Sequence, residues 1–311
     1  MAYSLSELNA AVRSDPRGFA QSCDDAFAQK VERAARQIAA HRTQSRVILL
    51  SGPSGSGKTT TALKIEEVLD HMGIETHTVS MDNYFNTIDP ETAPRNREGA
   101  IDYESPFCLD VELLNRHFSM LDRGETIHVP KYEFARQMRS DILSRPLRLG
   151  PDELAIFEGI HALSDIIVGK NPNAFKLYIA ARSDLVDDEG QVVFQHAWLR
   201  LCRRLVRDHL FRGSDAALTL KMWPNVQRGE KLYIAPYREN ADLMFDSSLA
   251  FEYAVLKPLA VPLLEAVPAG KYEVVDQMLR AFERIEAMDQ QHVAPASLAR
   301  EFIGGSPYDN H

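Results

Sequence analysis

The segment SRVILLSGPSGSGKTTTALKIEEVLDHMG, residues 45–73, constrains the fold more than any other part of this chain. Its short aliphatic run RVILL is typical of a buried strand, and Ser-Gly-Pro ends that run. Beyond the glycines, apolar residues recur at spacings of three and four, which predicts one face of a helix that stops at Gly73. These residues are Ala62, Ile65, Leu69 and Met72. A buried strand that turns through glycines into a helix predicts an α/β fold.

The loop between this strand and helix has the P-loop pattern Gly52-x4-Gly57-Lys58-Thr59. Glycines let backbone N–H groups turn toward one point and bind phosphate oxygens at a helix N-terminus. Lys58 would reach the β- and γ-phosphates, and the Thr59 hydroxyl would bind Mg²⁺, so we expect ATP and Mg²⁺ as cofactors. The residues expected to bind the nucleotide from this segment are Gly52, Ser54, Gly55, Ser56, Gly57, Lys58, Thr59 and Thr60.

Further strands and helices alternate along the chain. The predicted strands are 75–82, 153–159, 175–181 and 241–247, and the helices include 109–124 and 192–213. Such alternation predicts a parallel sheet covered by helices on both faces. Ligands bind at the carboxyl ends of the strands in such sheets. Residues 5–42 predict two more helices with a break at SDPRG, so we expect a helical N-terminal extension over 1–42 and a P-loop domain over 43–311.

Acidic residues follow two of the predicted strands. Asp82 could accept the proton of an attacking hydroxyl as a general base, or hold the metal, although an isolated Asp more often caps a turn. Glu158 ends the strand at 153–159 and suits a magnesium ligand, with an ordinary loop carboxylate as the alternative. We assign no role to His161.

A stripe of arginines marks the helix at 192–213. Arg200, Arg203, Arg204 and Arg207 share one face. A solvated face paired with acids is the ordinary interpretation. Because the chain already has a triphosphate to neutralise, we favour an arginine lid over about 190–230 that closes on the phosphates and excludes water. Arg200 and Arg203 are then catalytic candidates together with Asp82 and Lys58, and Arg204 a nucleotide ligand.

Composition excludes several function classes. The net charge of −9 argues against a nucleic-acid or anionic-membrane surface, and no apolar run is long enough to span a bilayer. The first thirty residues carry charges throughout, so we expect no secretory signal peptide. Three scattered cysteines do not form a disulfide framework, which favours reduced thiols in the cytoplasm.

Several motifs together resemble one known family. GPSGSGKTT, SMDNYF, DYES, VPKYEF, FEGIHAL and RLCRRLVRDHLFRG occur in this order, as in the uridine/cytidine kinases of the phosphoribulokinase–uridine kinase group. MWPNVQRGE, ENADLMFDSSLAFEYAVLKP and SLAREFIGG resemble stretches of a bacterial branch of uridine kinase-like nucleoside kinases, so the similarity runs from about residue 30 to 305. It implies a nucleoside monophosphate kinase-like P-loop fold with a substrate hairpin and an arginine lid.

The resemblance also implies site roles. Asp82 would be the general base on the nucleoside 5'-hydroxyl, and Asp102 would bind the ribose hydroxyls. The implied substrate-binding residues are Asp82, Tyr84, Asp102, Tyr132, Phe134, Gln137 and Arg139, and the implied metal ligands are Thr59, Asp82 and Glu158. The expected reaction is Mg²⁺-dependent transfer from ATP to uridine or cytidine, with no nucleic-acid or membrane partner; the resemblance also allows a homo-oligomer.

Two departures from the family pattern keep alternatives open. Gln137 stands where relatives have a base-reading histidine, and Trp198 and Leu199 replace an Asp-Thr pair before the lid arginine. The acceptor could therefore be another nucleoside, a polyol, pantothenate or a sugar phosphate. A regulatory NTPase is the alternative class: DDEG at 187–190 matches a short switch pattern, but NKxD is absent. A nucleotide-binding interaction module is a third class, and the intact catalytic residues argue against it.

Overall fold

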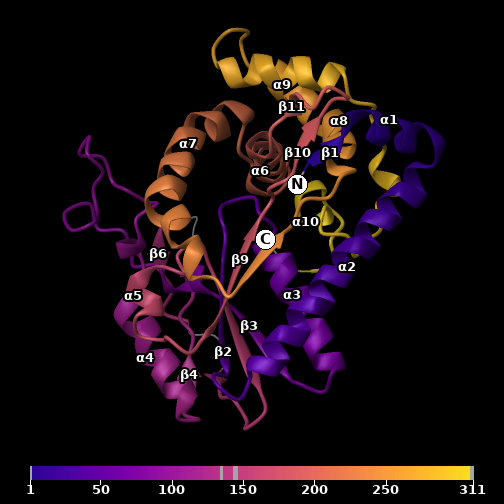
Figure 1. The fold of residues 1–311 in the computed structure, drawn as a ribbon. Helices are drawn as coiled ribbons and strands as arrows, with labels where there is room; N and C mark the ends of the chain where they lie inside the picture. The colour runs from indigo at the N-terminus through magenta and orange to yellow at the C-terminus, as the bar shows by residue number, and fades with distance from the viewer. Residues whose placement is uncertain (1, 134–135, 143–145, 309–311) are drawn as a thin grey trace.

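A five-stranded parallel sheet forms the centre of the computed structural model, which describes residues 2–133, 136–142 and 146–308 (Figure 1). Each strand corresponds to one that the sequence predicts, which confirms the expected α/β architecture. Listed across the sheet, the strands are β12 (Leu243–Asp246), β9 (Phe175–Ala180), β2 (Val47–Ser51), β8 (Leu154–Glu158) and β3 (Thr76–Ser80). The first strand of the P-loop segment therefore lies in the middle of the sheet.

Alternation along β2 divides the core into two layers. Ile48 and Leu50 point into one buried cluster, and Val47 and Leu49 into the other, because successive side chains of a strand face opposite ways. The cluster on the Ile48 side takes its residues from α3 (Lys58–His71), α6 (His196–Arg212), α7 (Ala216–Gly229), α8 (Glu252–Glu265) and α9 (Glu273–Glu283), among others. The other cluster includes α4 (Val111–Asp122) and α5 (Asp165–Val168). Helices thus cover both faces of the sheet.

The N-terminal segment forms two helices, α1 (Leu5–Ser14) and α2 (Pro16–His41), with the break at the predicted place. Asp15 caps α2 by accepting a hydrogen bond from the Gly18 N–H, and the proline that follows Asp15 suits the first helical position. Helix α2 packs against α3, and its apolar residues belong to the same buried cluster. The extension is therefore part of the main core.

A small second sheet was not predicted. Strand β1 (Ala2–Ser4) pairs with β10 (Asp184–Val186), and β10 pairs with β11 (Val192–Phe194). The prediction of a helix over 192–213 was therefore wrong at its start, and α6 begins only at His196. Two adjacent β-branched valines and a phenylalanine favour the strand once β10 offers a partner.

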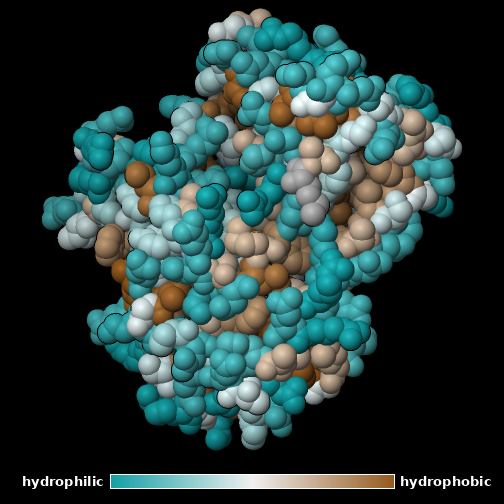
Figure 2. Space-filling model, viewed as in Figure 1, coloured by the Kyte–Doolittle hydropathy of each residue, from teal (hydrophilic) through white to brown (hydrophobic). Residues whose placement is uncertain are grey.

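The hydrophilic surface is interrupted by separate hydrophobic patches on the face that Figure 2 shows. None of the helices among the described residues combines the length and apolar character needed to cross a bilayer.

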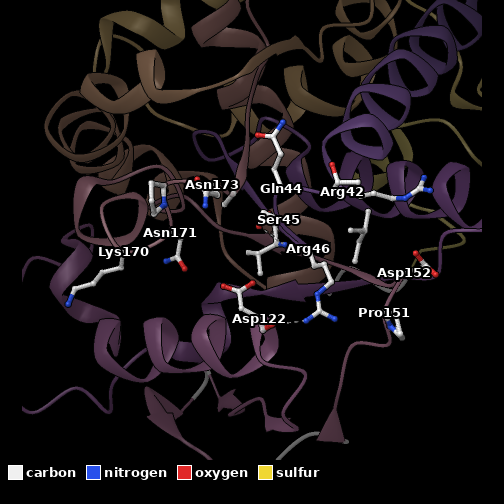
Figure 3. Close-up of a pocket in the computed structure, with 15 residues that line it drawn as sticks. Arg42, Gln44, Ser45, Arg46, Asp122, Pro151, Asp152, Lys170, Asn171 and Asn173 are labelled. Carbon is white, nitrogen blue, oxygen red and sulfur yellow. Dashed lines mark hydrogen bonds between the residues drawn. The ribbon is translucent and has the colours of Figure 1, made fainter.

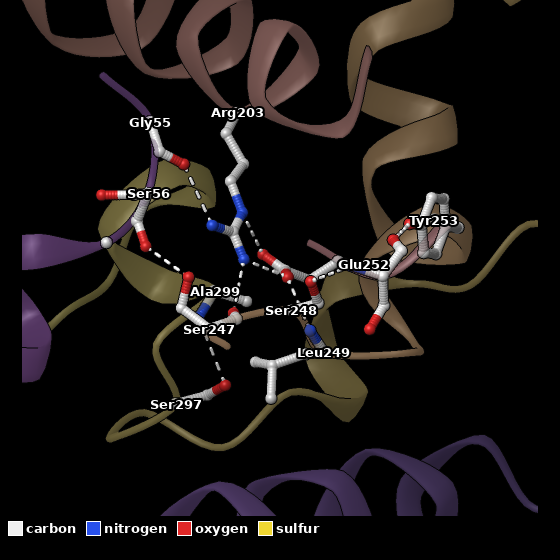
Figure 4. Close-up of polar contacts among 12 residues, drawn as sticks. Gly55, Ser56, Arg203, Ser247, Ser248, Leu249, Glu252, Tyr253, Ser297 and Ala299 are labelled. Atoms are coloured by element: carbon white, nitrogen blue, oxygen red, sulfur yellow. Dashed lines mark hydrogen bonds and ion pairs between the residues drawn. The ribbon is translucent and has the colours of Figure 1, made fainter. Parts of the chain in front are cut away.

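A buried guanidinium joins the helices to the P-loop (Figure 4). Arg203 of α6 is fully buried and pairs with Glu252 of α8 through two hydrogen bonds. Two more of its donors reach the carbonyl oxygens of Gly55, at 3.0 Å, and Ser247, at 2.9 Å. The ring of Phe302 lies 4.8 Å from the guanidinium, which adds a cation–π contact. One side chain thus connects α6, α8, the P-loop and the end of β12.

Replacing this arginine should destabilise the chain strongly. Arg203→Met leaves the Glu252 carboxylate buried without its partner. Breaking such a pair costs about 3–5 kcal/mol, so we expect a loss of that size in the free energy of unfolding, measured by urea denaturation.

Two comparisons make this prediction specific. Arg36→Met removes an exposed, solvent-screened ion pair with Glu32 and should lower the free energy of unfolding far less. The double variant Arg203→Met/Glu252→Met removes both charges and should recover part of the loss. A single Arg203→Met variant as stable as Arg36→Met would contradict the role given to the buried pair.

Candidate active site

The register of the sheet brings the predicted site residues to one edge. Glu158, the last residue of β8, pairs with Leu50 of β2 on one side and with Ser80 of β3 on the other. The P-loop (residues 52–59) starts directly after β2, and Asp82 lies two residues beyond β3. Because the strands are parallel, both segments leave the sheet beside Glu158.

Three charged groups meet at this edge. Burial and the nearby Asp82 raise the pKa of Glu158, Lys58 lowers it, and together these effects bring it to about 7. Burial also raises the pKa of Asp82, and Lys58 opposes that change. Burial lowers the pKa of Lys58, while Glu158 and Asp82 raise it. Lys58, Asp82 and Glu158 lie far apart in the sequence, but their charges interact at this edge of the sheet.

The P-loop has the close packing that its glycines allow. A Cβ on Gly52 would lie 1.9 Å from the Ile179 carbonyl oxygen of β9, so no other residue fits there. Gly57 has a φ of 78°, in the left-handed region, and precedes the first residue of α3. The Lys58 ammonium donates to the Pro53 carbonyl at 3.3 Å and so folds back over the loop. The loop leads directly into the N-terminus of α3, where helix N–H groups favour an anion.

The predicted stripe of arginines contacts the P-loop itself. Arg200 donates to the Ser54 carbonyl at 3.1 Å, and Arg204 donates to the Ser54 hydroxyl at 3.2 Å. With Arg203 on the Gly55 carbonyl, three arginines of α6 hold two neighbouring loop residues. The three side chains are mostly buried and each pairs with an acid, so the structure shows them bound to the loop and to carboxylates. Their catalytic and nucleotide-binding roles stay predictions.

Two other arginines act on the carboxyl at the strand end. Arg212 and Arg207 both lower the pKa of Asp82 through their positive charges. Arg207 also lowers the pKa of Lys58. The sequence placed Arg207 on the stripe without a role and did not single out Arg212.

A carboxylate from the C-terminal part of the chain contacts the first turn of α3. Glu301, in α10 (Arg300–Ile303), accepts a hydrogen bond from the Thr60 N–H at 3.3 Å. Leu298 lies against Gly57, where an added Cβ would be 2.7 Å from its side chain. The SLAREFIGG motif therefore packs on the phosphate loop, which its sequence alone did not indicate.

The Asp102 carboxylate, which the resemblance assigns to ribose binding, already has partners within the protein. Its side chain is 1% exposed and pairs with Arg228, while Tyr233 donates its hydroxyl proton at 2.9 Å. Burial alone would raise the pKa of Asp102, but the hydrogen bonds from Arg228 and Tyr233 bring it below its usual value. The sequence did not identify Arg228 or Tyr233. Ribose binding by Asp102 stays a prediction.

A two-stranded pairing lies beside the Asp82 segment, where the resemblance implies a substrate hairpin. It consists of β5 (Tyr132–Glu133) and β6 (Met138–Arg139), and the Tyr132 ring lies 5.6 Å from that of Phe85. The Ile88 N–H donates to the carbonyl of Gln137, which has a φ of 51°. Phe134 lies outside the described residues. The hairpin therefore contacts Phe85 and Ile88, which come shortly after Asp82 in the chain.

Two of the predicted substrate residues have partners inside the protein. Arg139 pairs with Asp110 at 3.0 Å and donates to the Tyr84 carbonyl. The Tyr84 side chain is fully buried, and its hydroxyl lies 2.8 Å from His117 Nδ1. Both residues therefore fix the segment that carries Asp82, and direct contact with a substrate stays a prediction for each.

The oxygen atoms at the strand ends fit a magnesium ion. Mg²⁺ prefers oxygen ligands and usually keeps several waters and substrate phosphates. The Thr59 hydroxyl at the start of α3 and the carboxyls of Asp82 and Glu158 are groups of this kind. Within the described ranges, no set of three or more His, Cys, Asp or Glu side chains could hold a metal alone. A site completed by phosphate oxygens matches this donor set.

A separate hollow of about 660 Å³ lies at the amino ends of the strands, near the start of β2 (Figure 3). Arg42, Arg46, Asp122 and Lys170 are among its polar lining residues. Arg46 there donates to the backbone carbonyls of Gly150, Leu121 and Asp122. Ligands of open parallel sheets bind at the opposite, carboxyl ends, so this hollow is not the active site.

The raised pKa of Glu158 predicts a pH-dependent stability. A carboxyl with a higher pKa in the folded chain than in the unfolded chain stabilises the fold when it is protonated. That contribution is complete below the ordinary value of 4.5 and disappears as the pH rises through about 7. We expect the free energy of unfolding, measured by urea denaturation without nucleotide, to fall between pH 5 and pH 7.5.

Glu158→Gln tests the assignment, because the amide does not titrate. Its stability should fall less steeply over this pH range than that of the unaltered chain. Glu283→Gln, at an exposed position of α9, is the matched control and should keep the original slope. Equal slopes for all three proteins would refute the assignment to Glu158.

Comparisons with known proteins agree with this geometry. The profile described as Phosphoribulokinase / Uridine kinase family matches residues 47–250. The uridine kinase of Halobacterium salinarum is 28% identical over 201 residues, which are 64% of this chain and 79% of that protein. The uridine kinase of Macrococcus caseolyticus is 28% identical over 203 residues, or 65% and 88% of the two chains.

A solved structure described as a possible uridine kinase from Bacillus stearothermophilus is 20% identical. It covers 70% of this chain and 98% of its own, with a TM-score of 0.46.

The matched range contains most of the residues of the candidate site. It begins at the first residue of β2 and extends past β12, so it includes all five central strands, the P-loop, Asp82, Glu158 and α6. Glu252 and Glu301, which support the loop, lie beyond it. The chain therefore belongs to the phosphoribulokinase/uridine kinase family and is a P-loop kinase, a phosphotransferase that acts on an alcohol acceptor.

Proposed function

We propose that this kinase transfers the γ-phosphoryl group of ATP to the 5'-hydroxyl of a pyrimidine nucleoside, uridine or cytidine, and requires Mg²⁺. The observation that carries the proposal is the meeting of Lys58, Asp82 and Glu158 at the carboxyl ends of adjacent strands. The relatives named uridine kinase support a nucleoside as acceptor.

Asp82 is the proposed general base. Its carboxyl follows β3 and is close enough to Lys58 for their charges to interact, so a hydroxyl held there would face the terminal phosphate. Burial raises its pKa, which makes the carboxylate a better proton acceptor, while Lys58, Arg212 and Arg207 keep the charged form accessible. Proton transfer to a positioned base is worth about 10²–10⁴ in rate.

Electrostatic stabilisation provides most of the remaining catalysis. Phosphoryl transfer has a loose transition state with charge spread over the phosphoryl oxygens, so positioned cations and N–H groups lower its energy. Lys58 and the N–H groups at the start of α3 bind the phosphates, and Arg207 adds positive charge beside them. Mg²⁺ bound by Thr59, Asp82 and Glu158 would neutralise the phosphate oxygens. The other α6 arginines keep the loop in shape.

The acceptor would bind between the hairpin and the segment that carries Asp102. Gln137 can form hydrogen bonds with a pyrimidine edge, and Tyr132 offers an aromatic face. The Asp102 carboxylate already accepts hydrogen bonds from Arg228 and Tyr233, and these compete with hydrogen bonds to a ribose. Other hydroxyl acceptors should therefore be tested as well.

A coupled ADP-release screen tests the proposal. Uridine, cytidine, purine nucleosides, pantothenate, polyols and sugar phosphates are offered with MgATP. ADP release that requires uridine or cytidine, with the 5'-monophosphate as product, supports the proposal. Release with another acceptor keeps the kinase and replaces the substrate. Release without any acceptor favours a regulatory NTPase instead.

Asp82→Asn tests the base. The variant should lower kcat for phosphoryl transfer about 10²–10⁴-fold, because the amide cannot accept the proton. The nucleotide Kd, measured without Mg²⁺ by titration with a fluorescent ATP analogue, should change little, since the P-loop is intact. A kcat near that of the unaltered enzyme would rule out Asp82 as the base.

Gln137→Ala tests acceptor recognition by the hairpin. We expect the KM for the nucleoside to rise about tenfold, the size of one lost hydrogen bond, while the KM for ATP stays the same. Steady-state kinetics with each substrate varied in turn measure both values. An unchanged acceptor KM would remove Gln137 from the recognition site.

A further inference from the structure

Three consecutive residues at the end of α7 connect both sides of the active site. Arg228 and Gly229 are the last residues of α7, and Glu230 begins a π-helical turn that ends at Ile234. Single π-helical turns are uncommon and often occur at functional sites. The three side-chain positions contact different parts of the site, although none of them belongs to the catalytic residues described above.

Arg228 binds Asp102, on the side of the site where the acceptor would bind. Its two terminal nitrogens donate to Asp102, one to Oδ1 and one to Oδ2 at 3.2 Å. Asp102 also accepts the Tyr233 hydroxyl at 2.9 Å and the Glu104 N–H at 3.3 Å. A carboxylate has about four lone-pair sites, so these four hydrogen bonds use its capacity. Arg228 and Tyr233 are therefore the main side-chain partners of Asp102.

Glu230 binds Arg200, on the side of the site where the P-loop lies. Its carboxylate accepts two hydrogen bonds from Arg200, at 2.9 Å and 2.6 Å. The Arg200 Nε–H donates to the Ser54 carbonyl of the P-loop. The Trp223 ring lies 5.7 Å from the guanidinium and helps to hold it in this orientation.

Gly229 brings the two sides together. A Cβ at this position would lie 2.4 Å from Cβ of Glu104, so only glycine lets α7 approach the loop 102–105 this closely. Glu104 itself interacts with both sides: burial raises its pKa, Arg204 lowers it, and Asp102 and Asp82 raise it.

We propose that Arg228, Gly229 and Glu230 form a clasp that sets the position of the loop 102–105 relative to the P-loop, and so aligns acceptor and nucleotide. The proposal rests on the proposed kinase function. Arg228 and Glu230 are positioning residues that act through Asp102 and Arg200 respectively. The clasp predicts that damage to each end affects a different substrate.

Arg228→Met and Glu230→Gln test the two ends separately. Arg228→Met leaves a buried carboxylate unpaired, so we expect the acceptor KM to rise at least tenfold with the nucleotide Kd within twofold of the original. Glu230→Gln loosens Arg200 on the P-loop, so the nucleotide Kd should rise severalfold and the acceptor KM should change less. Arg228→Lys keeps the charge but loses the paired geometry, and should give an intermediate acceptor KM.

Arg238→Met, at an exposed position beyond the π-helical turn, is the matched control and should leave both constants unchanged. An unchanged or lower acceptor KM in Arg228→Met overturns the proposal, because a lower value means that Arg228 only blocks Asp102. Equal effects of Arg228→Met and Glu230→Gln on both substrates also overturn it.

A measurement without turnover separates this proposal from the proposed function. Hydrogen exchange in Arg228→Met should become faster at residues 102–105 and stay unchanged in α4, whatever the acceptor is. If the acceptor screen yields no substrate, this result and the nucleotide Kd of Glu230→Gln still decide the clasp. Unchanged exchange at 102–105 refutes it.

Discussion

The parallel pairing of β8 with β2 and β3 determines where the charged groups of this site lie. Glu158 is in register with the ends of both neighbours, so the P-loop and the Asp82 segment have to leave the sheet on either side of it. A shift of one residue would turn Glu158 toward the opposite face of the sheet. The buried residues on both faces, Val47 and Ile48 among them, oppose any such shift. The hydrophobic core thus specifies the position of the chemistry.

The arginines close to the phosphate loop pair with acids of other elements or, for Arg204, with an acid one turn along the same helix. Arg203 pairs with Glu252, Arg200 with Glu230, and Arg204 with Asp208. Glu301 accepts the Thr60 N–H at the start of α3, a position where a helix favours an anion. These pairs keep the arginines against the loop. The clasp at the end of α7 extends the same arrangement to the acceptor side.

Sequence patterns were reliable where the signal is local. The five strands, the P-loop, the break between α1 and α2 and the acids after two strands follow from periodicity, turn residues and spacing. They failed at Val192–Phe194, because a strand needs a partner, and the partner β10 was not recognised. The interactions of Arg203 and Asp102 were also missed, since their partners Glu252 and Arg228 lie 49 and 126 residues away along the chain.

The sequence by itself determined the type of fold, the phosphate-binding loop and the carboxyl groups at the strand ends, because backbone propensity and side-chain periodicity act over a few residues. Only the tertiary structure decided which arginines hold the P-loop, which pair with Asp102, and which act on Asp82. One stripe on a helix offers every arginine the same spacing. What differs between them is burial and the carboxylate that the packed helices bring within reach, and both arise only when the chain is folded.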